Sequence, residues 1–127
     1  MRLTETHEKI LLFLISLHSF IVGLMLMFSA RWALQFAGWT VDPNPIFFIW
    51  QAGAFHFVLA AGYLVEYRRT KTIQLLLIAK TTAFVFLIGG SLLYPTPWSV
   101  WFSGFADGAM ALTAFFVHRA VAPNSGD

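Results

Sequence analysis

The chain has no cysteine and little charge. None of its 127 residues is Cys, and 11% are Asp, Glu, Lys or Arg. Without cysteine there is no disulfide, thiolate metal site or thiol redox chemistry, which excludes the enzymes that form disulfides with quinones. The net charge of +2 comes from few residues, so we expect no nucleic-acid binding. No activated nucleophile, metal cluster or phosphate-binding loop is recognisable, and the sequence therefore favours a protein that is not an enzyme.

The hydrophobic content of 58% exceeds the 45–50% that is roughly typical of soluble domains. About 20 apolar residues in a helix cross a hydrocarbon core about 30 Å thick. We therefore expect one all-α transmembrane domain over residues 1–127, an up-down four-helix bundle with a disordered tail at 121–127. The expected helices span about residues 10–30, 46–65, 72–93 and 98–117.

Positive charge is unequally divided between the two sides of this bundle. By the positive-inside rule, both termini are expected to be cytoplasmic in a plasma (inner) membrane. All five tryptophans map to the opposite, outer side, where their rings would lie at the headgroup level. The cytoplasmic side collects Arg2, Lys9, Arg68, Arg69, Lys71 and Arg119, and the outer side has Arg31.

The first outer loop carries aromatic residues at helical spacing. Trp32, Phe36 and Trp39 recur on one face, opposite Arg31 and Gln35. This pattern predicts a short interfacial helix on the outer leaflet, with an irregular loop as the alternative.

Short connections organise the remaining helices. Asn44-Pro45 supplies a cap and a first-turn proline for the second helix. The connections at 68–70 and 94–97 are short, so the second and third helices, and the third and fourth, are expected to pack as antiparallel neighbours.

Four ionisable residues fall near the middle of the apolar segments, one in each: His18, His56, Lys80 and Asp107. At about 1.5 Å per residue, Lys80 lies roughly 12 Å and Asp107 roughly 15 Å from opposite helix ends, so their depths nearly coincide in antiparallel neighbours. A lone charge costs on the order of 3 kcal/mol at that depth. We therefore predict a buried Lys80–Asp107 ion pair that fixes helix register, in preference to an ion or proton pathway.

His18 and His56 also come out near mid-bilayer. Two imidazoles on neighbouring helices could ligate one b-type haem, although hydrogen-bonded packing histidines are the favoured interpretation. The 14 Phe residues could line a site for a quinone, pigment or sterol, and lipid-facing and core packing is the simpler account.

Small residues lie beside the polar ones. Gly53 precedes His56 by three residues, and Gly104 and Gly108 form a small-xxx-small pair around Asp107. We predict close helix packing at all three glycines, with the pair on the last helix facing the third helix rather than a second copy of the chain.

The stretch from Ile78-Ala79-Lys80 to Phe105-Ala106-Asp107-Gly108, about the C-terminal half, resembles small DoxX-like four-helix bacterial membrane proteins. The resemblance implies a structural lysine and aspartate pair on the last two helices, carried here by Lys80 and Asp107. It implies no established activity. His18 and His56 do not map onto this pattern.

Three classes of function follow. The favoured one is a non-enzymatic accessory or assembly subunit that packs in a larger membrane complex, with other subunits or further copies of itself as partners. The second is a binder of haem b or another lipophilic cofactor through His18 and His56. The third is an oligomeric proton- or ion-coupled transporter that uses the midplane residues as a relay.

Overall fold

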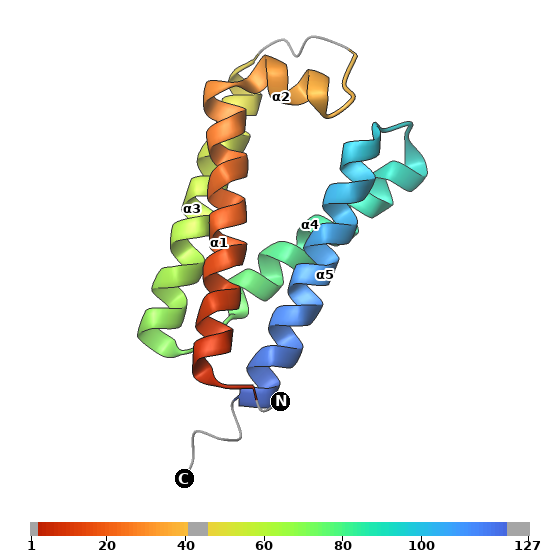
Figure 1. The fold of residues 1–127 in the computed structure, drawn as a ribbon. Helices are drawn as coiled ribbons and strands as arrows, with labels where there is room; N and C mark the ends of the chain where they lie inside the picture. Colours follow the sequence, from red (N-terminus) through yellow and green to blue (C-terminus); the bar gives the residue numbers. More distant parts are fainter. Residues whose placement is uncertain (1–2, 41–45, 122–127) are drawn as a thin grey trace.

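A computed structural model describes residues 3–40 and 46–121. The described residues form five α-helices, and four of them are long and apolar enough to cross a membrane (Figure 1). The expectation of an all-α bundle of four candidate membrane helices is therefore confirmed. The helices are α1 (Glu5–Phe28), α2 (Ala30–Phe36), α3 (Phe47–Thr70), α4 (Gln74–Leu93) and α5 (Trp98–Val121).

The helices are longer than the apolar segments, because they extend into charged residues at the basal end. There, local capping contacts stabilise the helical turns that hydrophobicity does not predict. The backbone N–H of Thr4 donates to Nδ1 of His7 (3.3 Å), so α1 starts ahead of its apolar run. α5 continues to Val121, the first residue of the expected tail. Residues 122–127 of that tail and the Asn44-Pro45 cap lie outside the described residues.

A tight turn joins α3 to α4. Lys71 adopts the left-handed conformation (φ 56°) and ends α3. The Glu66 carboxylate then caps α4 by accepting hydrogen bonds from the backbone N–H of Leu75 (3.0 Å) and the hydroxyl of Thr72 (3.2 Å). These contacts set the direction in which α4 leaves the turn.

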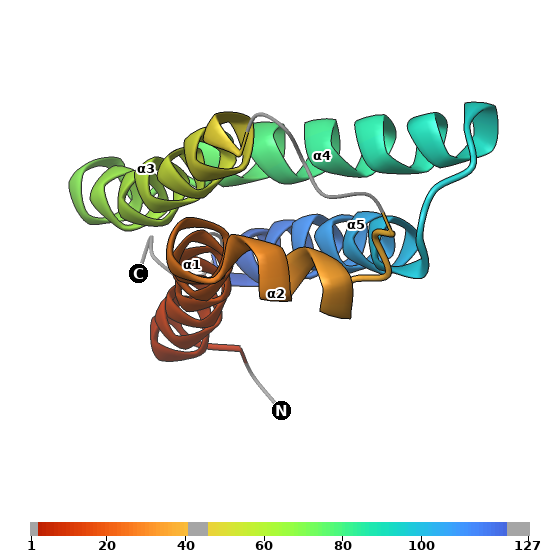
Figure 2. The same cartoon turned by 90° about the horizontal axis from the view of Figure 1, so that it is seen from above.

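The four long helices pack as two pairs, α1 with α3 and α4 with α5 (Figures 1 and 2). α1 begins and α5 ends at one end of the bundle, here called the basal end. The pairs meet there and diverge towards the distal end, which carries α2 (Figure 1). The short α3–α4 turn was expected to make these helices packed neighbours, yet α4 leaves α3 at an angle and packs along α5 instead.

α2 lies across the distal end of α1 (Figures 1 and 2). Its Trp32 and Phe36 rings stack with centroids 5.5 Å apart, and Phe36 meets Trp98 of α5 edge-on at 6.3 Å. The predicted short helix between the first two long helices is therefore present, and its aromatic face connects the two helix pairs at this end.

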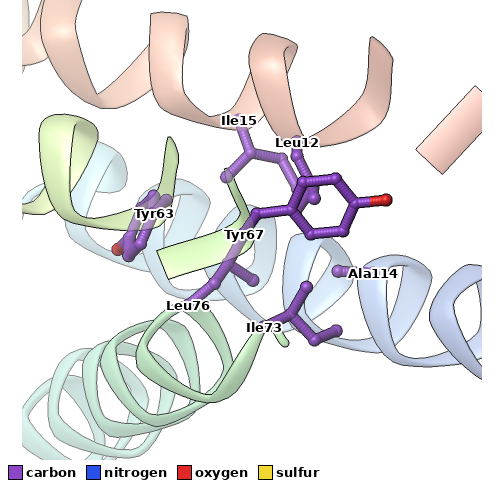
Figure 3. Packing of buried hydrophobic residues seen from close by; sticks show 7 residues of the cluster. All are labelled: Leu12, Ile15, Tyr63, Tyr67, Ile73, Leu76 and Ala114. Atoms are coloured by element: carbon purple, nitrogen blue, oxygen red, sulfur yellow. The ribbon is translucent and has the colours of Figure 1, made fainter. Parts of the chain in front are cut away.

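Where the pairs meet, all four long helices contribute to one buried group, here called the basal core (Figure 3). Leu12 and Leu76 are 2% and 0% exposed. Large apolar side chains cover much of the remaining surface, as expected of helices that face lipid. The basal core consists of Leu12, Ile15, Tyr63, Tyr67, Ile73, Leu76 and Ala114.

Candidate functional site

The Lys80–Asp107 ion pair lies between the antiparallel helices α4 and α5. Nζ of Lys80 donates to Oδ1 of Asp107 across 2.6 Å. The side chains are 4% and 14% exposed, so little solvent reaches either charge. The predicted buried pair is therefore present, and each charge removes most of the penalty that the other would carry alone.

Both histidines of the midplane lie close enough to this pair for its charges to act on them. Lys80 and Asp107 interact electrostatically with His18 of α1 and with His56 of α3, and the two histidines interact with each other. Asp107 also acts on the hydroxyl of Tyr63, one of the basal core residues of α3. These electrostatic interactions link residues from all four long helices around the ion pair, here called the midplane cluster: His18, His56, Tyr63, Lys80 and Asp107.

Two buried polar atoms of this cluster are not hydrogen-bonded. Within residues 3–40 and 46–121, the hydroxyl of Tyr63 and Nδ1 of His56 have no partner. Tyr63 is 2% exposed. An unpaired polar atom in such a place costs about 1–3 kcal/mol, and membrane hydrocarbon offers no water to pair with it. The hydroxyls of Ser16 and Ser19 on α1 are also buried and unpaired among the described residues.

The cluster is closed on one side and open on another. Tyr63 belongs to both groups, and the other basal core residues lie between the midplane cluster and the basal end on each long helix; no basal core residue is more than 6% exposed. His18 of α1, in contrast, is exposed. The basal core therefore closes the midplane cluster on the basal side, and His18 is the exposed member of the cluster.

A haem between α1 and α3 does not fit this packing. A Cβ built on Gly53 would lie 3.0 Å from the carbonyl oxygen of Gly23, so the two helices touch through their backbones. The rings of Phe20 and Phe57 close the next turn with centroids 5.2 Å apart. Two axial histidines must stand on opposite faces of a macrocycle. His18 and His56 come from helices in direct contact, which leaves no room for one.

The glycines singled out by the sequence lie at helix contacts. Gly53 faces Gly23 and Met27 of α1. On α5, Gly104 faces Ile88 of α4, and Gly108 faces Phe84, each within 3 Å of a built Cβ. A side chain at these positions would collide with the neighbouring helix, so all three glycines contribute to packing inside one chain.

An apolar groove of 660 Å³ runs between α4 and α5. Gly108 lines it beside Asp107, together with Phe84 and Phe105. In a bilayer, lipid hydrocarbon would cover such a surface. The groove therefore needs no ligand of its own.

A second buried polar group, which the sequence analysis missed, lies at the basal end. Glu8 is 4% exposed; its Oε2 accepts from the hydroxyl of Tyr67 (2.8 Å), and its Oε1 lies 2.5 Å from Nδ1 of His118. We call Glu8, Tyr67 and His118 the basal cluster. It joins α1, α3 and α5, and among the described residues its carboxylate has a partner for each oxygen.

A spacing signal could have found this group. Glu8 starts the series Leu12, Ile15 and Ser19 on the buried face of α1, at intervals of four, three and four residues. Asp107 and His118 are 11 residues apart on α5, and so are His56 and Tyr67 on α3. Eleven residues are three helical turns, so each helix contributes to both clusters from one face.

No group of three or more His, Cys, Asp or Glu in the described part of the chain is placed to hold a metal ion. Comparisons with protein family models, characterised proteins and solved structures find no match to this chain. Function is therefore inferred from the midplane cluster.

Proposed function

We propose that this protein is a non-enzymatic, multi-pass membrane protein that binds a lipophilic molecule by its polar head at the midplane cluster. The observation that carries this proposal is the pair of buried, unpartnered atoms, Tyr63 Oη and His56 Nδ1, beside a buried ion pair. Native interiors seldom leave such atoms unpaired, and a ligand head group would pair them.

The charges support one orientation in the membrane. The basal end carries most of the basic residues, so we place it, with both termini, in the cytoplasm of a cell with a plasma (inner) membrane. α2 and the tryptophan-rich distal end then lie at the outer leaflet, with α2 in the interface. The basal cations are Lys9, Arg68, Arg69, Lys71 and Arg119, and the distal cation is Arg31.

The route of entry follows from the closed basal side. The basal core blocks the way from the cytoplasmic end, while the side chain of His18 is exposed. A molecule dissolved in the bilayer would therefore approach the midplane cluster laterally, at His18. The same layer separates the two polar clusters, which favours binding over a transmembrane proton or ion relay.

An accessory role in a larger membrane complex is compatible with this binding site. The chain has 127 residues, short connections and no catalytic motif, so a bound lipophile would be used by another subunit. A stoichiometric partner in gently solubilised native membranes is the expected result for this part of the proposal.

The test is the identity of the lipids that accompany the purified full-length chain. Mass spectrometry of the wild-type protein should show one lipophile enriched over total membrane lipid, at up to one molecule per chain. The double variant Lys80→Met/Asp107→Leu, which removes the ion pair beside the unpartnered atoms while preserving bulk, should lose that enrichment. Tyr67→Phe, in the basal cluster, is the matched control and should retain it. A wild-type lipid profile identical to that of the membrane contradicts the proposal.

A further inference from the structure

We infer that a pocket at the distal end of the bundle binds the phosphate of an anionic phospholipid. The pocket has a volume of 500 Å³ and lies where the end of α1, the start of α2 and the start of α3 meet. Its lining contains Ser29, Arg31 and the two tryptophans Trp32 and Trp50, besides apolar residues. None of these residues belongs to the midplane cluster, so this site is separate from the one in the proposed function.

The level of the pocket in the membrane follows from the helices that line it. α1 and α3 are both candidate membrane spans, and the pocket lies at the distal end of each, where α2 crosses α1 (Figure 1). That level is a membrane–water interface in either orientation of the chain. Indole rings settle there because they combine an apolar ring with a polar N–H. Phospholipid phosphates lie at the same level, so the pocket meets them from the bilayer itself.

The charge of the pocket favours an anion. In the described stretches 19–40 and 46–55, which include α2 and the distal parts of α1 and α3, Arg31 is the only charged side chain. A guanidinium binds phosphate through two parallel hydrogen bonds. It has five N–H donors, so Arg31 can bind a phosphate and keep the contact that it already makes inside the chain. The hydroxyl of Ser29 does not cap α2 and adds a neutral donor.

The apolar part of the pocket fits the rest of the same lipid. Met27, Phe28 and Ile46 line it beside the polar residues, and Phe28 is exposed on α1. Phe47 and Phe48 are exposed at the start of α3. A lipid held by its phosphate can therefore place an acyl chain on apolar surface next to the pocket. The apolar groove between α4 and α5 differs, because no charged residue lines it and it offers a head group no counter-charge.

The experiment measures binding of the first lipid to the full-length protein by native mass spectrometry. The matched probes are dioleoyl phosphatidylglycerol, which is anionic, and dioleoyl phosphatidylcholine, which has the same acyl chains and no net charge. The anionic probe should bind about tenfold more tightly. Arg31→Gln should remove this preference, and Arg31→Lys, which keeps the charge without the two parallel bonds, should keep part of it. Arg68→Gln, which removes an exposed arginine at the basal end, is the matched control and should keep all of it.

Three results would overturn the inference. An unchanged preference in Arg31→Gln would place the lipid elsewhere, and an equal loss in Arg31→Gln and Arg68→Gln would show general attraction to positive charge. Displacement of the lipid by excess inorganic phosphate would indicate a site for the free ion. In lipid co-purified from native membranes, enrichment of an anionic phospholipid should persist in Lys80→Met/Asp107→Leu and disappear in Arg31→Gln, which separates this site from the midplane cluster.

Discussion

Two buried polar clusters in the same bundle differ in how completely their atoms are paired. In the basal cluster, Tyr67 and His118 provide a partner for each oxygen of Glu8. In the midplane cluster the charges are paired, yet Tyr63 and His56 each keep an unpartnered atom among the described residues. A closed cluster specifies how helices pack, and an incompletely paired one marks a place where another molecule can bind.

The two clusters have a common origin on the helices. α3 provides His56 to one and Tyr67 to the other, and α5 provides Asp107 and His118, each pair about 16 Å apart along its helix. The basal core occupies the turns between them. The clusters also differ in their helices, because α4 adds Lys80 to the midplane cluster and contributes no residue to the basal cluster.

Breaking the midplane ion pair should have the largest effect on stability. Lys80→Ala leaves the Asp107 carboxylate buried without its counter-charge, and we expect a loss of about 4 kcal/mol in the free energy of unfolding. Unfolding in mixed micelles by titration with SDS measures this loss. The double variant Lys80→Met/Asp107→Leu should recover most of the stability, because neither charge remains. A double variant as unstable as Lys80→Ala would show that the pair itself, and not the orphaned charge, sustains the fold.

Removing the Glu8 carboxylate from the basal cluster should have the second largest effect on stability. Glu8→Ala leaves the Tyr67 hydroxyl and the His118 ring without their partner, and we expect a loss of about 3 kcal/mol, since hydrogen bonds to charged groups contribute about 1.5–3 kcal/mol each. The same unfolding titration applies. Lipid retention at the midplane should not change in this variant. A loss of the enriched lipophile would mean that the two clusters are not independent.

Tyr67→Phe removes one hydrogen bond, of 2.8 Å, from the basal cluster and keeps the ring in the basal core. The expected loss is about 2 kcal/mol, because the bond is to a carboxylate. A change below about 0.5 kcal/mol would show that His118 alone satisfies Glu8 and that the basal cluster is less closed than its geometry indicates.

The midplane ion pair could be predicted from the sequence, while the basal cluster could not be predicted by the same reasoning. Lys80 and Asp107 stand out because hydrocarbon surrounds them, and the antiparallel arrangement brings their depths together. Glu8 and His118 lie outside the expected helices at 10–30 and 98–117, among charged residues that normally face water. Hydropathy therefore places them at the surface, although helical periodicity places Glu8 on a buried face.

Which helices pack as pairs also could not be predicted from the sequence. A short turn predicts that α3 and α4 are neighbours, but the Glu66 cap and the left-handed Lys71 set the exit angle of α4, and Gly104 and Gly108 favour contact with α5. The unpartnered atoms depend on this angle. The residues of the midplane cluster could thus be identified in part from the sequence, whereas its openness required the three-dimensional arrangement. The resemblance to DoxX-like proteins stays a prediction.

The smallest effect, and the sharpest test of the comparison, is expected from Tyr63→Phe. Tyr63 and Tyr67 are matched in residue type, helix and burial, and they differ in whether the hydroxyl is paired. In ligand-free protein, removing the unpaired hydroxyl of Tyr63 should raise the free energy of unfolding by about 1 kcal/mol, because an unsatisfied buried donor disappears. In protein loaded with its lipophile, the same substitution should lower it, because a hydrogen bond to the ligand is lost. Unfolding titrations of delipidated and loaded samples measure both values. For Tyr63→Phe, the free energy of unfolding should change with opposite signs in the delipidated and the loaded samples, as expected of a binding residue. For Tyr67→Phe, the sign should be the same in both samples, as expected of a packing residue. The same sign in both samples for Tyr63→Phe would mean that its hydroxyl does not contact the ligand.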